Sequence, residues 1–122
     1  MSSQEEKVKT LQRAQLLSQQ LRVLEDRFQL LQRRKDELSH ALEELKKAEE
    51  KGEKEVYQFL GANILIKKEL ETVKSEIEEE LSTIDSQLNL IKRQIDVGRK
   101  ELEKLLKQLG YTQTSGEATG GY

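Results

Sequence analysis

The chain has 122 residues, of which 36% are charged, 34% hydrophobic and 4% aromatic. This is too little apolar material for a compact globule and is typical of long helices with a narrow buried seam. The formal net charge of −2, with both signs interspersed, indicates neither nucleic-acid nor membrane binding. The absence of Cys excludes disulfides, and no apolar run approaches the ~18 residues of a membrane span, so we expect a cytoplasmic protein.

A long amphipathic helix is predicted from about residue 5 to about residue 50, because apolar residues recur at alternating steps of three and four. Its seam positions a and d are occupied by Ala14, Leu17, Leu21, Leu24, Phe28, Leu31, Lys35, Leu38, Leu42 and Leu45. This heptad repeat is typical of a coiled coil. Lys35 is the only charge in the seam, and it either fixes the register or extends its ammonium group to solvent.

Helical periodicity stops at a short central segment, where we predict a β-hairpin over about residues 55–67. Strand-forming residues run up to Gly61 and resume after Asn63. Gly and Asn tolerate positive φ, so Gly61, Ala62 and Asn63 are expected to connect two antiparallel strands. An isolated hairpin is marginally stable, and these strands are apolar on both faces. We therefore expect the hairpin to pair with hairpins of other copies or related subunits in a closed sheet.

A second helix is predicted over about residues 69–109, which gives one coiled-coil domain over residues 1–109. Its seam is expected to hold Leu81, Ile84, Leu88, Ile91, Ile95, Gly98, Leu102, Leu105 and Leu109. Gly98 costs about 1 kcal/mol of helix propensity and is expected to leave a gap, which is either a soft point or without a role. The small, polar and Gly-rich residues 110–122 are predicted to form a disordered tail.

The two helices are expected to pair in antiparallel orientation across the hairpin. The preferred register places Leu21 over Gly98 and Glu25 opposite Lys92, which is an attractive pair. A slip by one heptad would instead offer Glu25 to Arg99.

Catalytic and metal-binding patterns find no support in the sequence. His40, the only histidine, falls on the outer face of the first helix, and the acidic run 78–80 points in several directions around its helix. The glycine-rich phosphate-binding motifs are absent. We therefore expect no enzyme activity, no metal and no cofactor.

Some apolar residues lie outside the seam and form stripes on one side of the predicted coiled coil. They are Leu16, Val23 and Leu30 at position c of the first helix, Leu90 and Val97 at position c of the second, and Val8, Leu11, Leu106 and Leu109 near the chain ends. Such a surface normally binds another protein. Packing against a neighbouring helix, or scattered exposed leucines, explains the periodicity equally well.

The segment from Val56 to Gly61 has the pattern Val-Tyr-x-x-x-Gly. Ile64, Leu65, Ile66 and Lys67 form the second strand, and an acidic start of the second helix follows. In these motifs the sequence resembles the prefoldin family, specifically its β-type subunits, and the resemblance covers about residues 8–109. A single hairpin between the helices is similar to the β class, because α-type subunits carry two.

The resemblance implies a cytoplasmic hexamer of two α-type and four β-type subunits, whose hairpins close into β-barrels. It also implies an ATP-independent holdase that captures non-native polypeptides with the ends of its coiled coils and passes them to a group II chaperonin. The expected client-binding residues are Val8, Leu11, Leu16, Val23, Leu30, Leu90, Val97, Leu106 and Leu109. The expected assembly residues are Val56, Tyr57, Phe59, Leu60, Ile64, Leu65 and Ile66.

A competing hypothesis is a structural coiled-coil spacer, or a filament-forming adaptor, that assembles through the hairpin without holding clients. It explains the heptads and the hairpin but gives the apolar residues near the chain ends no purpose.

Overall fold

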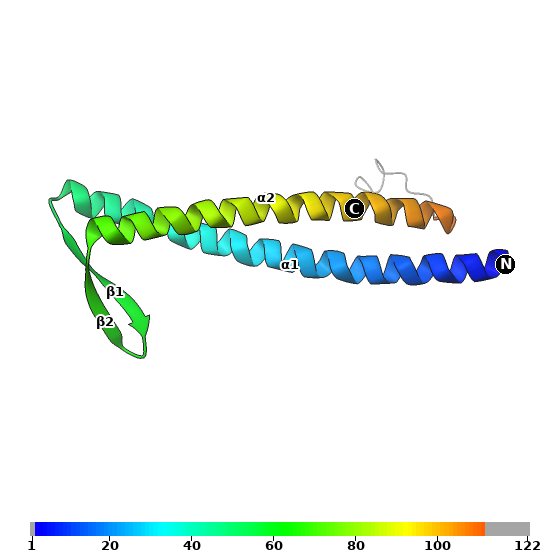
Figure 1. Ribbon diagram of the computed structural model, residues 1–122, viewed down its shortest axis with the longest axis horizontal. Helices are drawn as coiled ribbons and strands as arrows, with labels where there is room; N and C mark the ends of the chain where they lie inside the picture. Colours follow the sequence, from blue (N-terminus) through cyan, green and yellow to red (C-terminus); the bar gives the residue numbers. More distant parts are fainter. Residues whose placement is uncertain (1, 112–122) are drawn as a thin grey trace, which may run out of the picture. The chain divides into compact units, whose positions relative to one another are not determined.

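The protein is mainly helical, with a two-stranded antiparallel sheet between two long helices (Figure 1). The computed structural model describes residues 2–111, with elements in the order α1 (Ser3–Glu50), β1 (Glu55–Gly61), β2 (Ile64–Glu69) and α2 (Leu70–Gln108). The predicted fold class of paired helices and a central hairpin is thus confirmed. The second strand continues to residue 69 instead of ending near residue 67. Residues 112–122 of the predicted tail lie outside the described part of the chain.

Local backbone chemistry determines where α1 begins and ends. The Ser2 hydroxyl accepts a hydrogen bond from the Glu5 N–H at 3.1 Å, and the Glu5 carboxylate accepts one from the Ser2 N–H at 3.2 Å. This reciprocal pair is a capping box. At the other end Gly52 has a φ of 87°, and the Glu53 N–H donates to the Ala48 carbonyl at 3.0 Å. This left-handed glycine ends the helix in a Schellman motif.

Backbone hydrogen bonds also mark both ends of the second helix. The N–H of Leu70 donates to the Lys54 carbonyl at 2.8 Å, which closes the base of the hairpin where α2 begins. Gly110 has a φ of 92°, and the Tyr111 N–H donates to the Leu106 carbonyl at 3.0 Å. Gly110 and Tyr111, the first two residues of the predicted tail, thus form the Schellman end of α2.

The hairpin has a two-residue turn and one bulge. Ala62 and Asn63 have φ values of 49° and 61°, and two such residues in succession are typical of the turn that suits twisted antiparallel strands. Gly61 pairs with Ile64, and a register shift leaves Leu60 as the bulged residue. The predicted three-residue connection is therefore one residue too long, because Gly61 belongs to β1.

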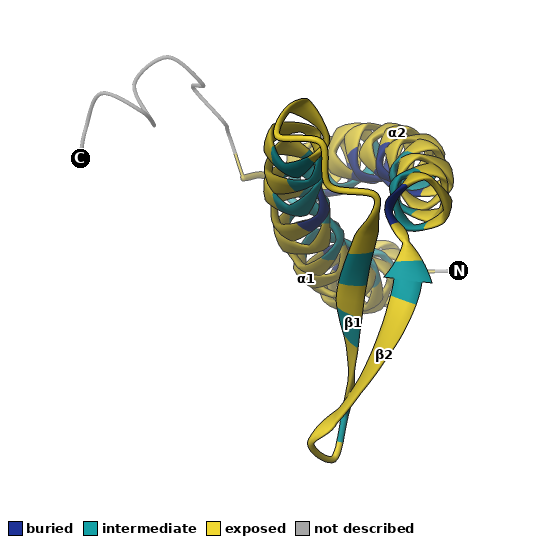
Figure 2. Ribbon diagram, turned by 90° about the vertical axis from the view of Figure 1, so that its left-hand side faces the viewer, coloured by how far each residue is buried: buried dark blue, intermediate teal, exposed yellow. Residues whose placement is uncertain are grey.

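The described residues fall into two compact units, each of which contains part of both helices. Of the described residues, the end unit comprises 2–28 and 90–111, and the hairpin unit comprises Gln29–Asn89. Each has a narrow line of buried side chains along its helices (Figure 2). These are Ala14, Leu21, Ile91, Ile95 and Leu105 in the end unit, and Leu38, Leu70, Ile84 and Leu88 in the hairpin unit. All of them except Leu70 occupy predicted a or d positions.

The hairpin unit accommodates the charge in its seam with an ion pair between the helices. The Lys35 ammonium lies 2.9 Å from a carboxylate oxygen of Asp85, and the Lys35 side chain is 37% exposed. The ammonium therefore leaves the seam, as the interpretation of extension toward solvent predicts, and meets a carboxylate on α2. Nearby, the Arg34 guanidinium lies 2.9 Å from Glu80.

The end unit confirms one part of the predicted register and corrects another. A Cβ placed on Gly98 would lie 2.7 Å from Cδ2 of Leu21, so Leu21 does pack over Gly98. The expected gap at Gly98 is wrong, because the Leu21 side chain fills it. Glu25 pairs with Arg99 at 2.5 Å, so its predicted partner Lys92 is also wrong. The side chain of Arg99 is long and flexible, so it can reach an acid on α1 that is not directly opposite it. One salt bridge therefore does not determine the backbone register.

Candidate functional site

Reactive groups do not gather anywhere in the described part of the chain. Within residues 2–111, no group of three or more His, Cys, Asp or Glu side chains is arranged to hold a metal ion. The His40 side chain is 74% exposed, and its nearest charged neighbour is Glu44 at 4.0 Å. Neither described helix combines the length and the apolar character of a membrane span. The candidate sites are therefore surfaces that bind through packing.

The first candidate is the hairpin surface, which we define as the exposed apolar residues of β1 and β2. It consists of Tyr57, Phe59, Leu60, Ile64, Leu65 and Ile66, of which Tyr57 is the most exposed at 68% and Ile66 the least at 37%. In the strand register Phe59 lies directly opposite Leu65. Paired residues share a face of the sheet, so these two side chains form one apolar patch, and both remain largely exposed, at 64% and 60%. The seventh expected assembly residue, Val56, is half-buried.

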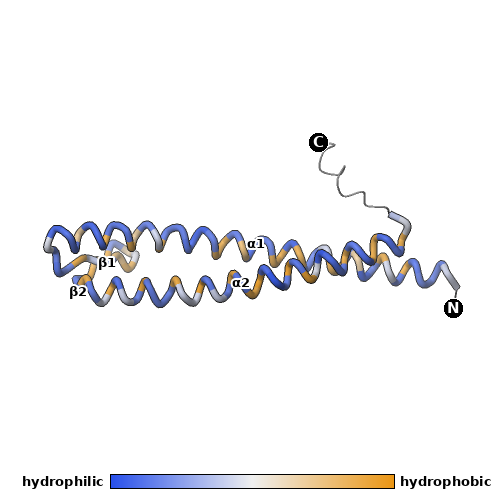
Figure 3. Tube along the Cα trace, turned by 90° about the horizontal axis from the view of Figure 1, so that it is seen from above, coloured by the Kyte–Doolittle hydropathy of each residue, from blue (hydrophilic) through white to orange (hydrophobic). Residues whose placement is uncertain are grey.

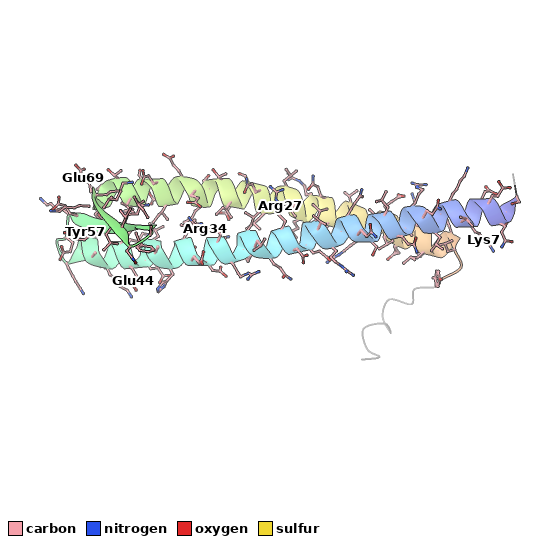
Figure 4. The ribbon with its side chains drawn as sticks, turned by 90° about the horizontal axis from the view of Figure 1, so that it is seen from below. Lys7, Arg27, Arg34, Glu44, Tyr57 and Glu69 are labelled. Atoms are coloured by element: carbon pink, nitrogen blue, oxygen red, sulfur yellow. The ribbon has the colours of Figure 1, made fainter. Side chains whose placement is uncertain are left out.

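The other face of the hairpin is partly covered within its own unit. Val56 and Gln58 alternate with the exposed residues of β1 and are half-buried. A cavity of about 540 Å³ lies between β1 and the two helices. Val56 and Gln58 line it from this face, Arg34 and Glu44 line it from α1, and Tyr57 also borders it (Figure 4). The expectation that both faces lack cover is therefore correct for only one of them.

Two carboxyl groups share a hydrogen bond near the base of the hairpin. The pKa of Glu71 is raised because its carboxyl hydrogen-bonds to that of Glu49, whose negative charge acts in the same direction. The pKa of Glu49 is lowered by the same hydrogen bond and by Lys74, whose ammonium lies 3.1 Å away. Lys74 in turn has a raised pKa, chiefly through its hydrogen bond to Glu49. This cluster connects the end of α1 to the start of α2.

The second candidate is an open apolar groove in the end unit, which we call the side groove. Its volume is about 750 Å³, and its lining residues are Leu17, Gln20, Leu21, Val23, Leu24, Arg93, Gln94, Val97, Gly98 and Glu101. The groove follows the side on which positions c and g of both helices face each other. In Figure 3, hydrophobic segments of both helices lie along this unit.

The structure leaves the predicted c stripes exposed. Val23 and Val97 are 66% and 68% exposed and line the side groove. Leu16 and Leu90 are 57% and 50% exposed in the same unit. Leu30, which is 60% exposed, belongs to the hairpin unit.

The end unit also contains a smaller group of apolar residues from both ends of the described chain, which we call the terminal cluster. Val8, Leu11, Leu109 and Tyr111 line a cavity of about 170 Å³ together with Gln4 and Lys7. Val8 and Leu11 are exposed, whereas Leu106 and Leu109 are half-buried. Sequence reasoning missed Tyr111, although Gly110 followed by an aromatic residue is a signal for a Schellman end with its hydrophobic contact.

Comparison with known proteins agrees with this arrangement of two helices, one hairpin and exposed apolar surfaces. The family model described as "Prefoldin subunit" matches residues 5–115. The chain belongs to the prefoldin family. The structure of the prefoldin beta subunit from Thermococcus strain KS-1 is similar to this prefoldin, with a TM-score of 0.73 and 23% sequence identity over 85% of this chain and 89% of that one. No match was found among curated proteins.

The predicted resemblance to β-type prefoldin subunits is therefore confirmed for family and fold. Prefoldins are chaperones and not enzymes, so membership supports a chaperone-type function for this chain. Family membership also implies assembly with other prefoldin subunits.

Proposed function

We propose that this prefoldin is a subunit of a cytoplasmic, ATP-independent holdase that captures non-native polypeptides and passes them to a group II chaperonin. The observation that carries this proposal is the side groove with its neighbouring terminal cluster. Together they present exposed aliphatic residues on a helical unit whose seam is already filled. Continuous apolar surface of this kind normally contacts another protein.

We propose that the hairpin surface serves a separate purpose, which is assembly into a hexamer of two α-type and four β-type subunits. Two-stranded hairpins need further strands or a packed face to be stable. Here one face holds Phe59 opposite Leu65 with both side chains exposed, at 64% and 60%. Within residues 2–111 each strand pairs with one neighbouring strand, so its outer edge offers backbone N–H and C=O groups to another hairpin.

Holding would then be a physical process without a chemical step. Each aliphatic side chain that a client buries contributes at most about 1.5–3 kcal/mol. Several such contacts on different subunits of one complex add through multivalency. Weak individual contacts allow release without nucleotide hydrolysis.

The test is aggregation suppression by the assembled complex after substitution of Leu11, Leu16, Leu106 and Leu109 by Ser. We expect weaker suppression with an unchanged native mass, because these changes remove apolar surface from the end unit only. A complex in which Gln12 and Gln15 are replaced by Ser is the control and should suppress aggregation as the wild type does. Full suppression by an intact complex of the four-leucine variant would contradict the assignment. Absence of suppression by the wild type would favour the spacer hypothesis.

A further inference from the structure

We propose that the side groove binds an amphipathic α-helix with acidic flanks, supplied by a helical segment of a client polypeptide. That helix would lie as a third helix beside α1 and α2 of the end unit. The inference rests on the proposed holding function and adds the kind of segment that the groove selects.

The spacing of the exposed side chains favours a helix over an extended chain. Leu16 and Val23 are seven residues apart on α1, and so are Leu90 and Val97 on α2. Seven residues of helix span about 10.5 Å, which matches the heptad repeat of a third helix. Side chains on one face of an extended chain recur about every 6.7 Å, so a strand does not repeat the same contacts.

The volume of the groove, about 750 Å³, suits a side chain inserted from a helix. Leu21 and Gly98 both line it, and Leu21 packs into the space that a Cβ on Gly98 would occupy. Val23 and Val97 form exposed walls on the two sides, and the neutral amide Gln94 also lines the groove. A hole bordered by residues of two helices is what a knob from a third helix fills in a helical bundle.

Within residues 11–28 of α1 and 90–106 of α2, the two faces of the end unit carry different charges. On the groove face, the charged residues at positions c and g are Arg13, Arg27, Lys104 and Glu101. On the opposite face, the charged residues at positions b and e are Arg22, Lys92, Arg99, Glu25, Asp96 and Glu103. The opposite face is balanced and contains the Glu25–Arg99 pair, whereas the groove face has an excess of cations.

The cations of the groove face are also available for a partner. Arg93, at position f of α2, lines the groove together with Glu101, and Arg13, Arg27 and Lys104 lie at positions c and g of the same face. Within residues 2–111, Arg13, Arg27, Arg93 and Lys104 form no ion pair with another side chain. A helix with acidic residues beside its apolar seam therefore complements the groove in both shape and charge.

The probe for this proposal is a labelled synthetic peptide of about 21 residues with Leu at heptad positions a and d and Glu at e and g. Its affinity for the assembled complex is measured by fluorescence anisotropy. One control peptide replaces Glu with Lys, and another carries two central Pro residues that prevent helix formation. We expect the acidic helical peptide to bind at least about tenfold more tightly than either control.

Two neighbouring cations provide a matched pair of variants. Arg93→Glu reverses a charge that lines the groove, whereas Lys92→Glu makes the same reversal on the opposite face. We expect Arg93→Glu to weaken peptide binding about tenfold and Lys92→Glu less than about twofold. Val97→Asp places a charge in the groove wall and should weaken binding at least as much as Arg93→Glu.

Three results would overturn the inference. They are equal binding of the basic or Pro-containing peptide, equal effects of the Arg93 and Lys92 substitutions, and a self-association of this chain that Val97→Asp abolishes. The last result would identify a second copy as the occupant. If the complex suppresses aggregation but does not prefer the acidic helix, the proposed function stands and this inference fails. If it binds the acidic helix without suppressing aggregation, the proposed function fails and clients are not the source of the helix.

Discussion

The hairpin surface and the side groove are both exposed and apolar, but they offer different kinds of contact. The hairpin surface combines aromatic and aliphatic side chains with strand edges, so a partner strand gains backbone hydrogen bonds as well as apolar burial. The side groove lies between helices whose backbone groups are satisfied internally, so a partner there meets only side chains.

This difference suggests which surface suits lasting assembly and which suits reversible binding. Backbone pairing in one register requires a partner of defined length and pattern, which is typical of subunits that recognise each other. Side-chain packing in an open groove tolerates many partners, which a holdase requires. Burial alone does not separate the two surfaces, since Phe59 and Val23 are 64% and 66% exposed.

The largest effect is expected from placing charges on the hairpin surface. Phe59→Asp together with Leu65→Asp puts two carboxylates side by side on the uncovered face, because these residues are paired across the strands. Burying either without a partner would cost several kcal/mol, so we expect loss of the complex in native mass measurements. Val23→Asp with Val97→Asp is the matched control in the end unit and should leave the native mass unchanged. A normal complex formed by the hairpin variant would remove the proposed division between the surfaces.

An intermediate effect is expected at Gly98, which lines the side groove and contacts Leu21. Gly98→Ala improves helix propensity by roughly 1 kcal/mol, but its Cβ would lie 2.7 Å from Leu21, which is only 5% exposed. Overpacking costs about 1–3 kcal/mol, so we expect a net loss of about 1 kcal/mol in the free energy of unfolding. Ser18→Ala, at an exposed helical position, should instead stabilise the protein slightly. Urea unfolding measures both changes, and a stabilised Gly98 variant would show that Leu21 moves aside without cost.

The smallest effect is expected in the hairpin unit, at the carboxyl pair of Glu49 and Glu71. The raised pKa of Glu71 means that its contribution to stability is present at low pH and is lost as the pH rises through that pKa. The lowered pKa of Glu49 acts in the opposite sense, and its contribution is lost as the pH falls. Glu71→Gln can donate to Glu49 without a titrating proton. We therefore expect the variant to gain stability relative to the wild type as the pH rises above the ordinary pKa of a glutamate and through the raised pKa of Glu71.

Thermal unfolding at several pH values measures this gain. Glu71→Ala is the control, because it removes the second carboxyl group but cannot donate a hydrogen bond. Glu71→Gln should exceed Glu71→Ala in melting temperature at neutral pH. If the melting temperatures of Glu71→Gln and the wild type differ by the same amount at every pH, the carboxyl pair is unimportant for stability.

The sequence predicts the elements of this fold well because each has a strong local signal. Heptads give both helices, and the change to strand-forming residues before Gly61 gives the hairpin. Seam periodicity allows the packing of Leu21 on Gly98 but also a register one heptad away, and the pair of Glu25 with Lys92 that favoured the first register does not form. The observed salt bridge of Glu25 does not follow from periodicity either, because a long arginine can reach more than one turn.

Other features depend on backbone conformations that residue type suggests only weakly. Ala62 adopts a positive φ that alanine rarely favours, so the two-residue turn was not evident. Tyr111 joins the terminal cluster because the Schellman end at Gly110 reverses the chain. The side groove depends on how ten residues of both helices pack, which periodicity does not show.

The two-residue turn at Ala62 and Asn63 also has a consequence for the order of folding. It closes the shortest loop in the chain, after which contacts between the helices join residues at growing separation, from 25 residues for Glu49 and Lys74 to 74 for Glu25 and Arg99. Because closing long loops costs more entropy, the hairpin unit is expected to form first and the end unit last. The unit that forms last also opens first, so the same topology gives the groove and the terminal cluster the faster local opening that amide hydrogen exchange detects.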